Sequence, residues 1–187
     1  MQSVCVFCSS SQGLDPAYTE AARSLGRTLA EANIRLVFGG GHVGLMGVVS
    51  NAALEAGGDV IGVIPRSLVE RELAHAGLTD LRIVGSMHER KALMFDLSEG
   101  FITLPGGTGT LEEFFEGLTW AQLGEHEKPC GLLNVAGYYD PLLSVFDHMV
   151  HKGFLSESNR ALVLVESGPE RLLQRFESYQ PPRPPCG

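Results

Sequence analysis

The stretch FITLPGGTGTLEEFF, residues 101–115, decides the fold. A short apolar run ends in a proline and a glycine-rich turn, after which apolar residues recur at helical spacing. This pattern predicts a buried strand, a tight turn and a helix, the repeating unit of a parallel α/β sheet. Glycine in the turn permits a positive φ and lets the backbone approach a ligand closely.

The same unit repeats along the chain. Nearly continuous apolar runs predict seven strands, at 3–8, 34–38, 60–64, 81–84, 101–104, 131–135 and 161–165. Helical patterns separate them, at 15–32, 44–57, 87–98, 110–124, 138–152 and 169–179. We therefore expect a single doubly wound, Rossmann-like α/β domain over residues 1–179, with a mostly parallel sheet of about seven strands. Residues 180–187 read as a Pro-rich tail, and 66–79 as a longer connection.

Composition and charge exclude several classes of function. The 14 Lys and Arg residues stand against 22 Asp and Glu, a net charge of -8. Such a chain gains no counterion-release affinity for nucleic acid or an anionic membrane. The apolar runs are far shorter than the roughly 20 residues of a spanning helix, and the N-terminus has no signal-peptide pattern. Four cysteines at this length do not suggest a disulfide framework. We expect a cytoplasmic protein with a small-molecule ligand.

Glycine is in excess: the chain has 23, where average usage predicts about 13. Five lie in residues 39–47 (GGGHVGLMG), which we call the first glycine loop, and three in residues 105–110 (PGGTGT), the second glycine loop. Each loop leads from a predicted strand to a predicted helix, whose N-terminus offers free N–H groups to a phosphate. The alternative is that these glycines only permit tight turns and close helix–sheet contacts.

Two known nucleotide motifs do not fit. Gly39, Gly41 and Gly44 match GxGxxG formally, but they follow the second strand, and the next strand lacks the acidic residue that binds ribose. The P-loop sequence GxxxxGK[ST] is absent. The chain is therefore neither a typical NAD-binding protein nor a P-loop NTPase.

Charged residues near helix starts have two interpretations. Residues 86–89 (SMHE) and 110–113 (TLEE) both fit capping boxes, so Glu113 can simply cap a helix that begins after Thr110. Alternatively, Glu113 faces the uncharged part of a bound phosphorylated ligand. Arg90 and Lys91 oppose the helix dipole, so they either pair with Glu89 on the surface or meet an anion at the edge that holds the glycine loops.

Together these motifs resemble one family. Residues 105–113 (PGGTGTLEE) resemble the PGGxGTxxE signature of the cytokinin-activating phosphoribohydrolases, often labelled lysine decarboxylase-like. Residues 87–91 (MHERK), the first glycine loop, residues 119–124 (TWAQLG) and residues 128–134 also match, and the resemblance extends to about residue 179. It implies hydrolysis of the N-glycosidic bond of an adenine-type nucleoside 5′-monophosphate, to free base and ribose 5-phosphate. It also implies a homodimer, with the active site near its interface, that needs no metal or cofactor.

The resemblance implies roles for particular residues. Arg90 and Glu113 would be the catalytic pair, the segment 107–113 would bind phosphate and ribose, and Glu72, Lys91 and Thr119 would complete the site. The expected substrate-binding set is Gly40, Gly41, Glu72, Met87, Arg90, Lys91, Gly106, Gly107, Thr108, Gly109, Thr110, Leu111, Glu112, Glu113 and Thr119.

Three alternatives are weighed against this hydrolase. A pyridoxal phosphate decarboxylase needs a Schiff-base lysine, and only Lys91, Lys128 and Lys152 exist, with no identifiable partner for the pyridine nitrogen. A non-catalytic nucleotide-binding or sensing module needs the glycine loops but not Arg90 with Glu113. A scaffold protein would leave both loops unexplained. The preferred base, N6-prenylated or plain adenine, stays open.

Overall fold

All seven strands lie in one sheet and every pair is parallel, in the order β4-β3-β2-β1-β5-β6-β7. The computed structural model describes residues 1–71 and 74–181. The strands are β1 (Ser3–Phe7), β2 (Arg35–Phe38), β3 (Val60–Pro65), β4 (Asp80–Val84), β5 (Phe101–Thr103), β6 (Cys130–Leu133) and β7 (Val163–Glu166). The seven strands and the parallel sheet predicted from the sequence are confirmed, while Glu72 and tail residues 182–187 lie outside the described residues.

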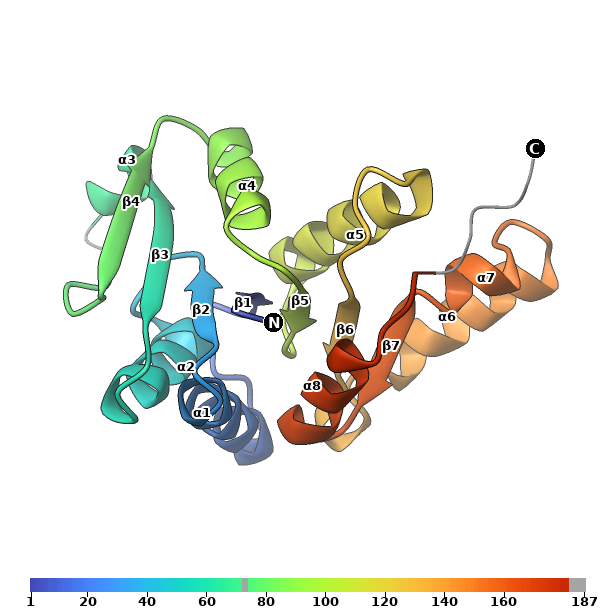
Figure 1. The fold of residues 1–187 in the computed structure, drawn as a ribbon, viewed down its shortest axis with the longest axis horizontal. Helices are drawn as coiled ribbons and strands as arrows, with labels where there is room; N and C mark the ends of the chain where they lie inside the picture. Colours follow the sequence, from blue (N-terminus) through green and yellow to red (C-terminus); the bar gives the residue numbers. More distant parts are fainter. Residues whose placement is uncertain (72–73, 182–187) are drawn as a thin grey trace.

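Helices connect the strands and cover both faces of the sheet (Figure 1). They are α1 (Pro16–Glu31), α2 (Gly44–Glu55), α3 (Arg66–Val69), α4 (Met87–Asp96), α5 (Thr108–Leu123), η1 (Val135–Gly137), α6 (Asp140–His151), α7 (Glu157–Arg160) and α8 (Pro169–Glu177). The three shortest, α3, η1 and α7, were not predicted, because three or four residues are too few to show a helical period. Helix α3 lies in the stretch predicted as a connection.

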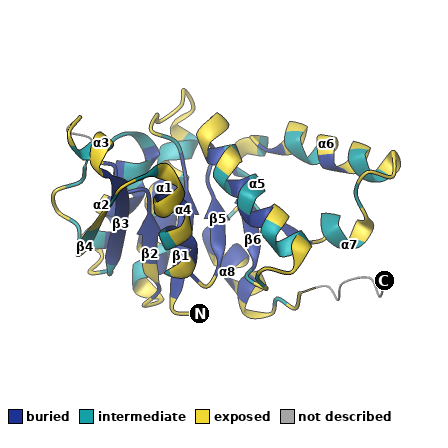
Figure 2. Cartoon of the chain, turned by 90° about the horizontal axis from the view of Figure 1, so that it is seen from above, coloured by how far each residue is buried: buried dark blue, intermediate teal, exposed yellow. Residues whose placement is uncertain are grey.

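Burial on both faces explains the continuous apolar runs. In β6, Leu132 packs with Phe114 and Phe146 on the α5 and α6 side, whereas Leu133 packs with Leu172 on the α1, α2 and α8 side. Figure 2 shows the central strands as a dark, buried layer between half-exposed helices, whereas the edge strand β4 has no buried residue. Within the described ranges, no helix is long and apolar enough to cross a bilayer.

The two predicted capping boxes have different outcomes. The first is confirmed for its serine: Ser86 Oγ accepts from the Glu89 amide at 3.1 Å, while Glu89 Oε2 accepts at 2.7 Å from the amide of Gly85, the residue before the N-cap. The second is wrong, because α5 begins at Thr108 with Gly107 as its N-cap. Glycine is a favourable N-cap residue even without a capping side chain, so the helix can start two residues before Thr110. Glu113 is therefore not an N-terminal cap.

The strand order creates a switch point at the centre of the sheet. The chain runs outward from β1 through β2, β3 and β4, then returns to β5 on the other side of β1. Val6 is in register with Phe38 of β2 and with Ile102 of β5, so the three carboxyl ends meet at one edge. Ligands of doubly wound proteins bind outside such a switch point.

Candidate active site

A cavity of about 460 Å³ opens at this edge. Its walls come from five segments far apart in sequence, each following or facing the end of a central strand. The lining residues beyond β1 are Cys8, Ser9 and Ser10; those beyond β2 are Gly39, Gly41, Val43 and Met46; those at β3 and α3 are Ile64 and Leu68; those of α4 are Met87 and Arg90; and those at the start of α5 are Gly107, Thr108, Gly109, Thr110, Glu112 and Glu113.

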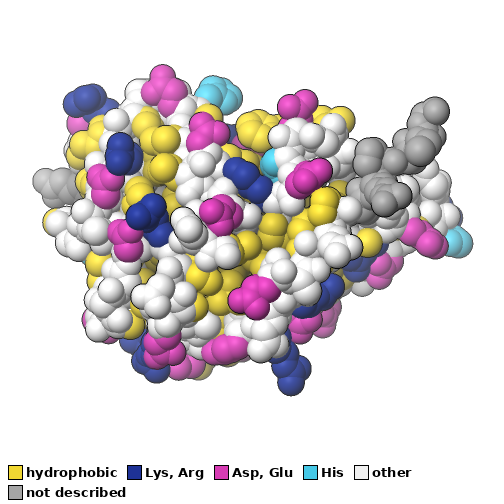
Figure 3. Space-filling model, viewed as in Figure 1, with side chains coloured by type: hydrophobic (Ala, Val, Ile, Leu, Met, Phe, Trp, Pro, Cys, Tyr) yellow, Lys and Arg dark blue, Asp and Glu magenta, His cyan; other side chains and the backbone are white. Residues whose placement is uncertain are grey.

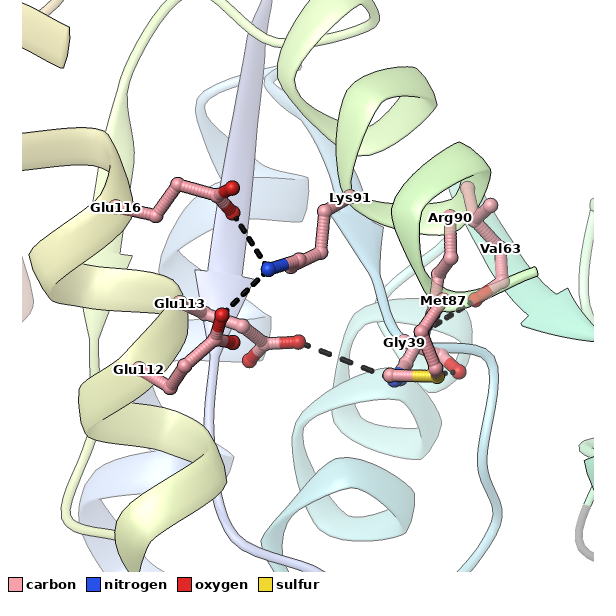
Figure 4. Close-up of polar contacts among 8 residues, drawn as sticks. All are labelled: Gly39, Val63, Met87, Arg90, Lys91, Glu112, Glu113 and Glu116. Atoms are coloured by element: carbon pink, nitrogen blue, oxygen red, sulfur yellow. Dashed lines mark hydrogen bonds and ion pairs between the residues drawn. The ribbon is translucent and has the colours of Figure 1, made fainter.

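Arg90 is a buried, fixed cation in the cavity wall (Figure 4). Its Nε donates to the Val63 carbonyl at 3.0 Å, and its Nη2 donates to the Gly39 carbonyl at 2.9 Å. These carbonyls lie near the ends of β3 and β2, so the guanidinium bridges two strands. Glycine at position 39 leaves room for the guanidinium, because a Cβ there would lie 1.8 Å from Nη2 and Arg90 would have to move.

Glu113 faces Arg90 across the cavity. Its Oε1 lies 3.9 Å from Arg90 Nη1, and its side chain is only 13% exposed. Burial raises the pKa of Glu113 to about 7, against the opposing attraction of Arg90, while Glu112 raises the pKa further. The carboxyl group can therefore gain or lose a proton near neutral pH, a property common among catalytic acids and bases.

Lys91 turns away from the cavity, contrary to the expectation that it meets a ligand anion. Its Nζ pairs with Glu112 Oε1 at 2.5 Å and with Glu116 Oε2 at 2.9 Å (Figure 4). Burial acts to lower the pKa of Lys91, but the hydrogen bonds to both carboxylates outweigh it and the pKa is raised. Adjacent helical positions face different directions, which explains why Arg90 lines the cavity and Lys91 ties α4 to α5 instead.

The second glycine loop presents free donors. Within the described part of the chain, the amides of Thr108, Gly109 and Thr110 make no backbone hydrogen bond, and no side chain caps Gly107. A Cβ built at Gly107 or Gly109 would meet nothing within 4 Å. These two glycines thus leave open space above the N-terminus of a 16-residue helix, where N–H groups and the helix dipole favour an anion.

The first glycine loop has a different role. The amides of Leu45 and Met46, at the start of α2, already donate to the Ser9 carbonyl at 3.0 and 3.3 Å. Gly44 has a φ of 60°, and a Cβ there would lie 2.2 Å from the Ser10 carbonyl carbon. The loop therefore fits the alternative interpretation, in which glycines permit a close contact. Here that contact is with the segment after β1.

The expected binding residues are only partly brought together. Gly41, Met87, Arg90, Glu112, Glu113 and the segment 107–110 line the cavity. Gly40, Lys91, Gly106, Leu111 and Thr119 do not, and Thr119 is exposed farther along α5. Sequence reasoning missed Ser9 and Ser10, although both directly follow the first strand. It also missed an apolar wall formed by Val43 and Met46 after β2 and by Ile64 and Leu68 at β3 and α3.

Surface charge agrees with a small ligand. On the face shown in Figure 3, acidic and basic side chains are interspersed and separated by apolar atoms, with no continuous basic stripe. A basic stripe is the electrostatic footprint of a nucleic-acid-binding surface. That face therefore gives no support to a polyanion as the ligand.

Comparison with known proteins shows which family the chain belongs to. The family described as "Possible lysine decarboxylase" matches residues 46–176. Cytokinin riboside 5′-monophosphate phosphoribohydrolase LOG3 of Arabidopsis thaliana is 50% identical over 178 residues, covering 95% of this chain and 83% of the relative. The chain belongs to this phosphoribohydrolase family. The corresponding enzyme of Rhodococcoides fascians is 52% identical over 165 residues, 88% of this chain and 83% of that one.

More distant solved structures share the fold. The molybdenum cofactor binding protein of Rippkaea orientalis superposes with a TM-score of 0.71 at 24% identity, covering 95% of this chain and 96% of that one. The molybdenum cofactor carrier protein of Chlamydomonas reinhardtii gives the same TM-score at 19% identity, covering 95% and 99%. At these identities the likeness concerns the fold alone, and it confirms the Rossmann-like architecture.

Proposed function

We propose that this protein hydrolyses the N-glycosidic bond of cytokinin riboside 5′-monophosphate, and of related adenine-type nucleoside 5′-monophosphates, to free base and ribose 5-phosphate. One observation carries the proposal: the buried Arg90–Glu113 pair lies in the same cavity as the unbonded N-terminus of α5. Curated relatives about half identical over most of the chain bear this activity in their names.

The substrate's phosphate fits the start of α5. The free amides of Thr108, Gly109 and Thr110 would donate to it, and the open space above Gly107 and Gly109 leaves room for its oxygens. At another part of the cavity wall, Val43, Met46, Ile64 and Leu68 offer apolar surface to the base. An N6-prenylated adenine suits that wall better than plain adenine, because the prenyl group adds apolar area to bury.

Glu113 would act at the ribose. Cleavage passes through a state with positive charge at C1′, which a nearby carboxylate stabilises while it orients the attacking water. The water oxygen bonds to C1′ as the C1′–N9 bond breaks, and one water proton goes to the Glu113 carboxylate. The departing base takes a proton from bulk water, and Glu113 later returns its proton to bulk water, so that one water is consumed in each turnover. Arg90 would assist the base or hold the phosphate, and its two backbone hydrogen bonds fix its position in advance.

A substrate assay tests the proposal. The protein is incubated with N6-prenylated AMP and, separately, with AMP, and free base is measured by chromatography. We expect base release from the prenylated nucleotide, a loss of at least about 100-fold in Glu113→Gln, and normal turnover in Glu125→Gln, an exposed carboxylate beyond α5. Binding without base release would instead support the second candidate, a nucleotide-binding or sensing module.

Three finer proposals accompany this one. We propose a homodimer with the active site near its interface, supported by the exposed apolar side chains of Met87, Leu123 and Phe154; light scattering tests it.

We also propose a cytoplasmic protein, supported by the unpaired, buried thiols of Cys5, Cys8 and Cys130. Finally, we propose that residues 1–179 form one domain and that 180–187 contribute nothing to folding, which a truncation at 179 tests.

A further inference from the structure

Two consecutive tyrosines from the turn after β6 reach the loop after β5. Tyr138 Oη donates to the Gly106 carbonyl at 2.7 Å, and Tyr139 Oη donates to the Leu104 carbonyl at 2.6 Å. Neither tyrosine lines the main cavity. Both bonds end on backbone carbonyls of the loop that leads into α5, so the two hydroxyls hold that loop from outside the substrate cavity.

The turn that carries these tyrosines is rigidly built. Ala136 and Gly137 have φ values of 50° and 72°, a left-handed conformation that is rare for alanine. The Asn134 side chain accepts from the Tyr139 amide at 2.7 Å and donates to Asp140 Oδ1 at 2.7 Å, closing the turn. Strained turns persist only where the surrounding structure fixes them, and they concentrate at functional sites.

The Tyr138 ring is held on two sides. It lies edge to face with Tyr18 of α1, at 5.5 Å between centroids, and with Tyr139, at 5.0 Å. With the ring fixed, the hydroxyl reaches the Gly106 carbonyl without losing further rotational freedom. Tyr138 is 38% exposed, but these two ring contacts restrict its motion and thereby pre-organise the hydrogen bond.

The Gly106 carbonyl shares a peptide plane with the Gly107 amide. In a trans peptide the C=O and N–H point in opposite directions, so fixing the carbonyl toward Tyr138 directs the Gly107 N–H away from it. That amide makes no backbone hydrogen bond within residues 1–71 and 74–181, and Gly107 is the N-cap of α5. A carbonyl that accepts a hydrogen bond also polarises its own N–H, making it a stronger donor.

We propose that Tyr138 is a positioning residue for phosphate binding, which orients and polarises the Gly106–Gly107 peptide so that its N–H joins the free amides of α5. The inference rests on the proposed phosphate site. Tyr138 touches no substrate and acts only through this peptide.

Tyr138→Phe tests the role, because it removes the hydroxyl and keeps the ring contacts. The dissociation constant for ribose 5-phosphate, measured by calorimetry, should rise about 3- to 10-fold, the effect of one modest hydrogen bond. The KM for the nucleotide should rise equally, while kcat stays within about twofold. Tyr18→Phe is the matched control, since its ring makes the same contact but its hydroxyl bonds nothing in the described structure.

Two results would overturn the inference: an unchanged affinity for ribose 5-phosphate in Tyr138→Phe, or a fall in kcat with KM unchanged. Gly109→Asp separates this failure from failure of the phosphate site. The position is open, and a carboxylate suits the first turn of a helix, so the variant should fold while it repels phosphate. If Gly109→Asp binds ribose 5-phosphate normally, the phosphate site is wrong; if it does not bind while Tyr138→Phe binds with wild-type affinity, only the role of Tyr138 is wrong.

Discussion

Replacing Glu113 by glutamine should stabilise the protein at alkaline pH while abolishing turnover. Folding raises the pKa of this carboxyl from 4.5 to about 7, chiefly through burial. A group whose pKa is raised by folding contributes stability that is present in full below the unfolded pKa and is lost as pH rises through the folded one. The native protein should therefore lose about 3 kcal/mol of unfolding free energy between pH 4 and pH 8 through this group.

The measurement is urea unfolding of both proteins at several pH values and one fixed protein concentration. Glutamine has no charge to desolvate, so the stability difference, variant minus wild type, should grow by about 3 kcal/mol from pH 4 to pH 8 and then level off. Because all other titrating groups are shared, they largely cancel in the difference. A difference that does not change with pH would refute the reasoning, since Glu113 would then titrate alike in the folded and unfolded chains.

Three further predictions concern the neighbours of Glu113. Arg90→Met leaves two buried carbonyls without a donor and should lower stability by about 2–5 kcal/mol in thermal or urea unfolding, with turnover reduced at least about 100-fold. Gly39→Ala should displace the guanidinium and reduce kcat/KM at least about 10-fold in steady-state kinetics, with the far-ultraviolet circular dichroism spectrum unchanged. In pH–rate profiles, Lys91→Met should raise the pKa assigned to Glu113, because Lys91 lowers that pKa in the native protein. Glu116→Gln should lower it, because the Glu116 carboxylate raises the pKa of Glu113. Shifts of both variants in the same direction would contradict this reasoning.

The sequence predicted the sheet because strands buried on both faces leave uninterrupted apolar runs. The family signature also indicated Arg90 and Glu113 as candidate catalytic residues, which spacing alone did not. Spacing alone equally allowed Glu113 to be a helix cap, whereas the helix starts at Thr108 with Gly107 as its N-cap. The opposite orientations of Arg90 and Lys91 depend on how α4 packs against α5, which no local pattern encodes.

Two other features depended on tertiary structure in the same way. Both glycine loops looked alike, yet in the first the amides of Leu45 and Met46 are occupied by the Ser9 carbonyl, a contact between segments more than thirty residues apart in sequence. The hydrogen bond from Tyr138 to the Gly106 carbonyl joins the loops that follow the neighbouring strands β6 and β5. Such contacts appear only once the strand order is known.

The open space at Gly107 and Gly109 distinguishes glycines that ligand binding requires from glycines that folding requires. At Gly44 and Gly47 an added methyl group would strike the backbone carbonyl of Ser10 or of His42, so the fold itself disfavours substitution. At Gly107 and Gly109 an added methyl group would meet no protein atom within 4 Å, so it would obstruct only the ligand of the proposed phosphate site. A mutational scan scored for both abundance and turnover should therefore find that alanine at the latter two positions leaves abundance intact and lowers turnover. In such a scan, the positions where a substitution keeps abundance but lowers turnover would mark the residues that surround the ligand.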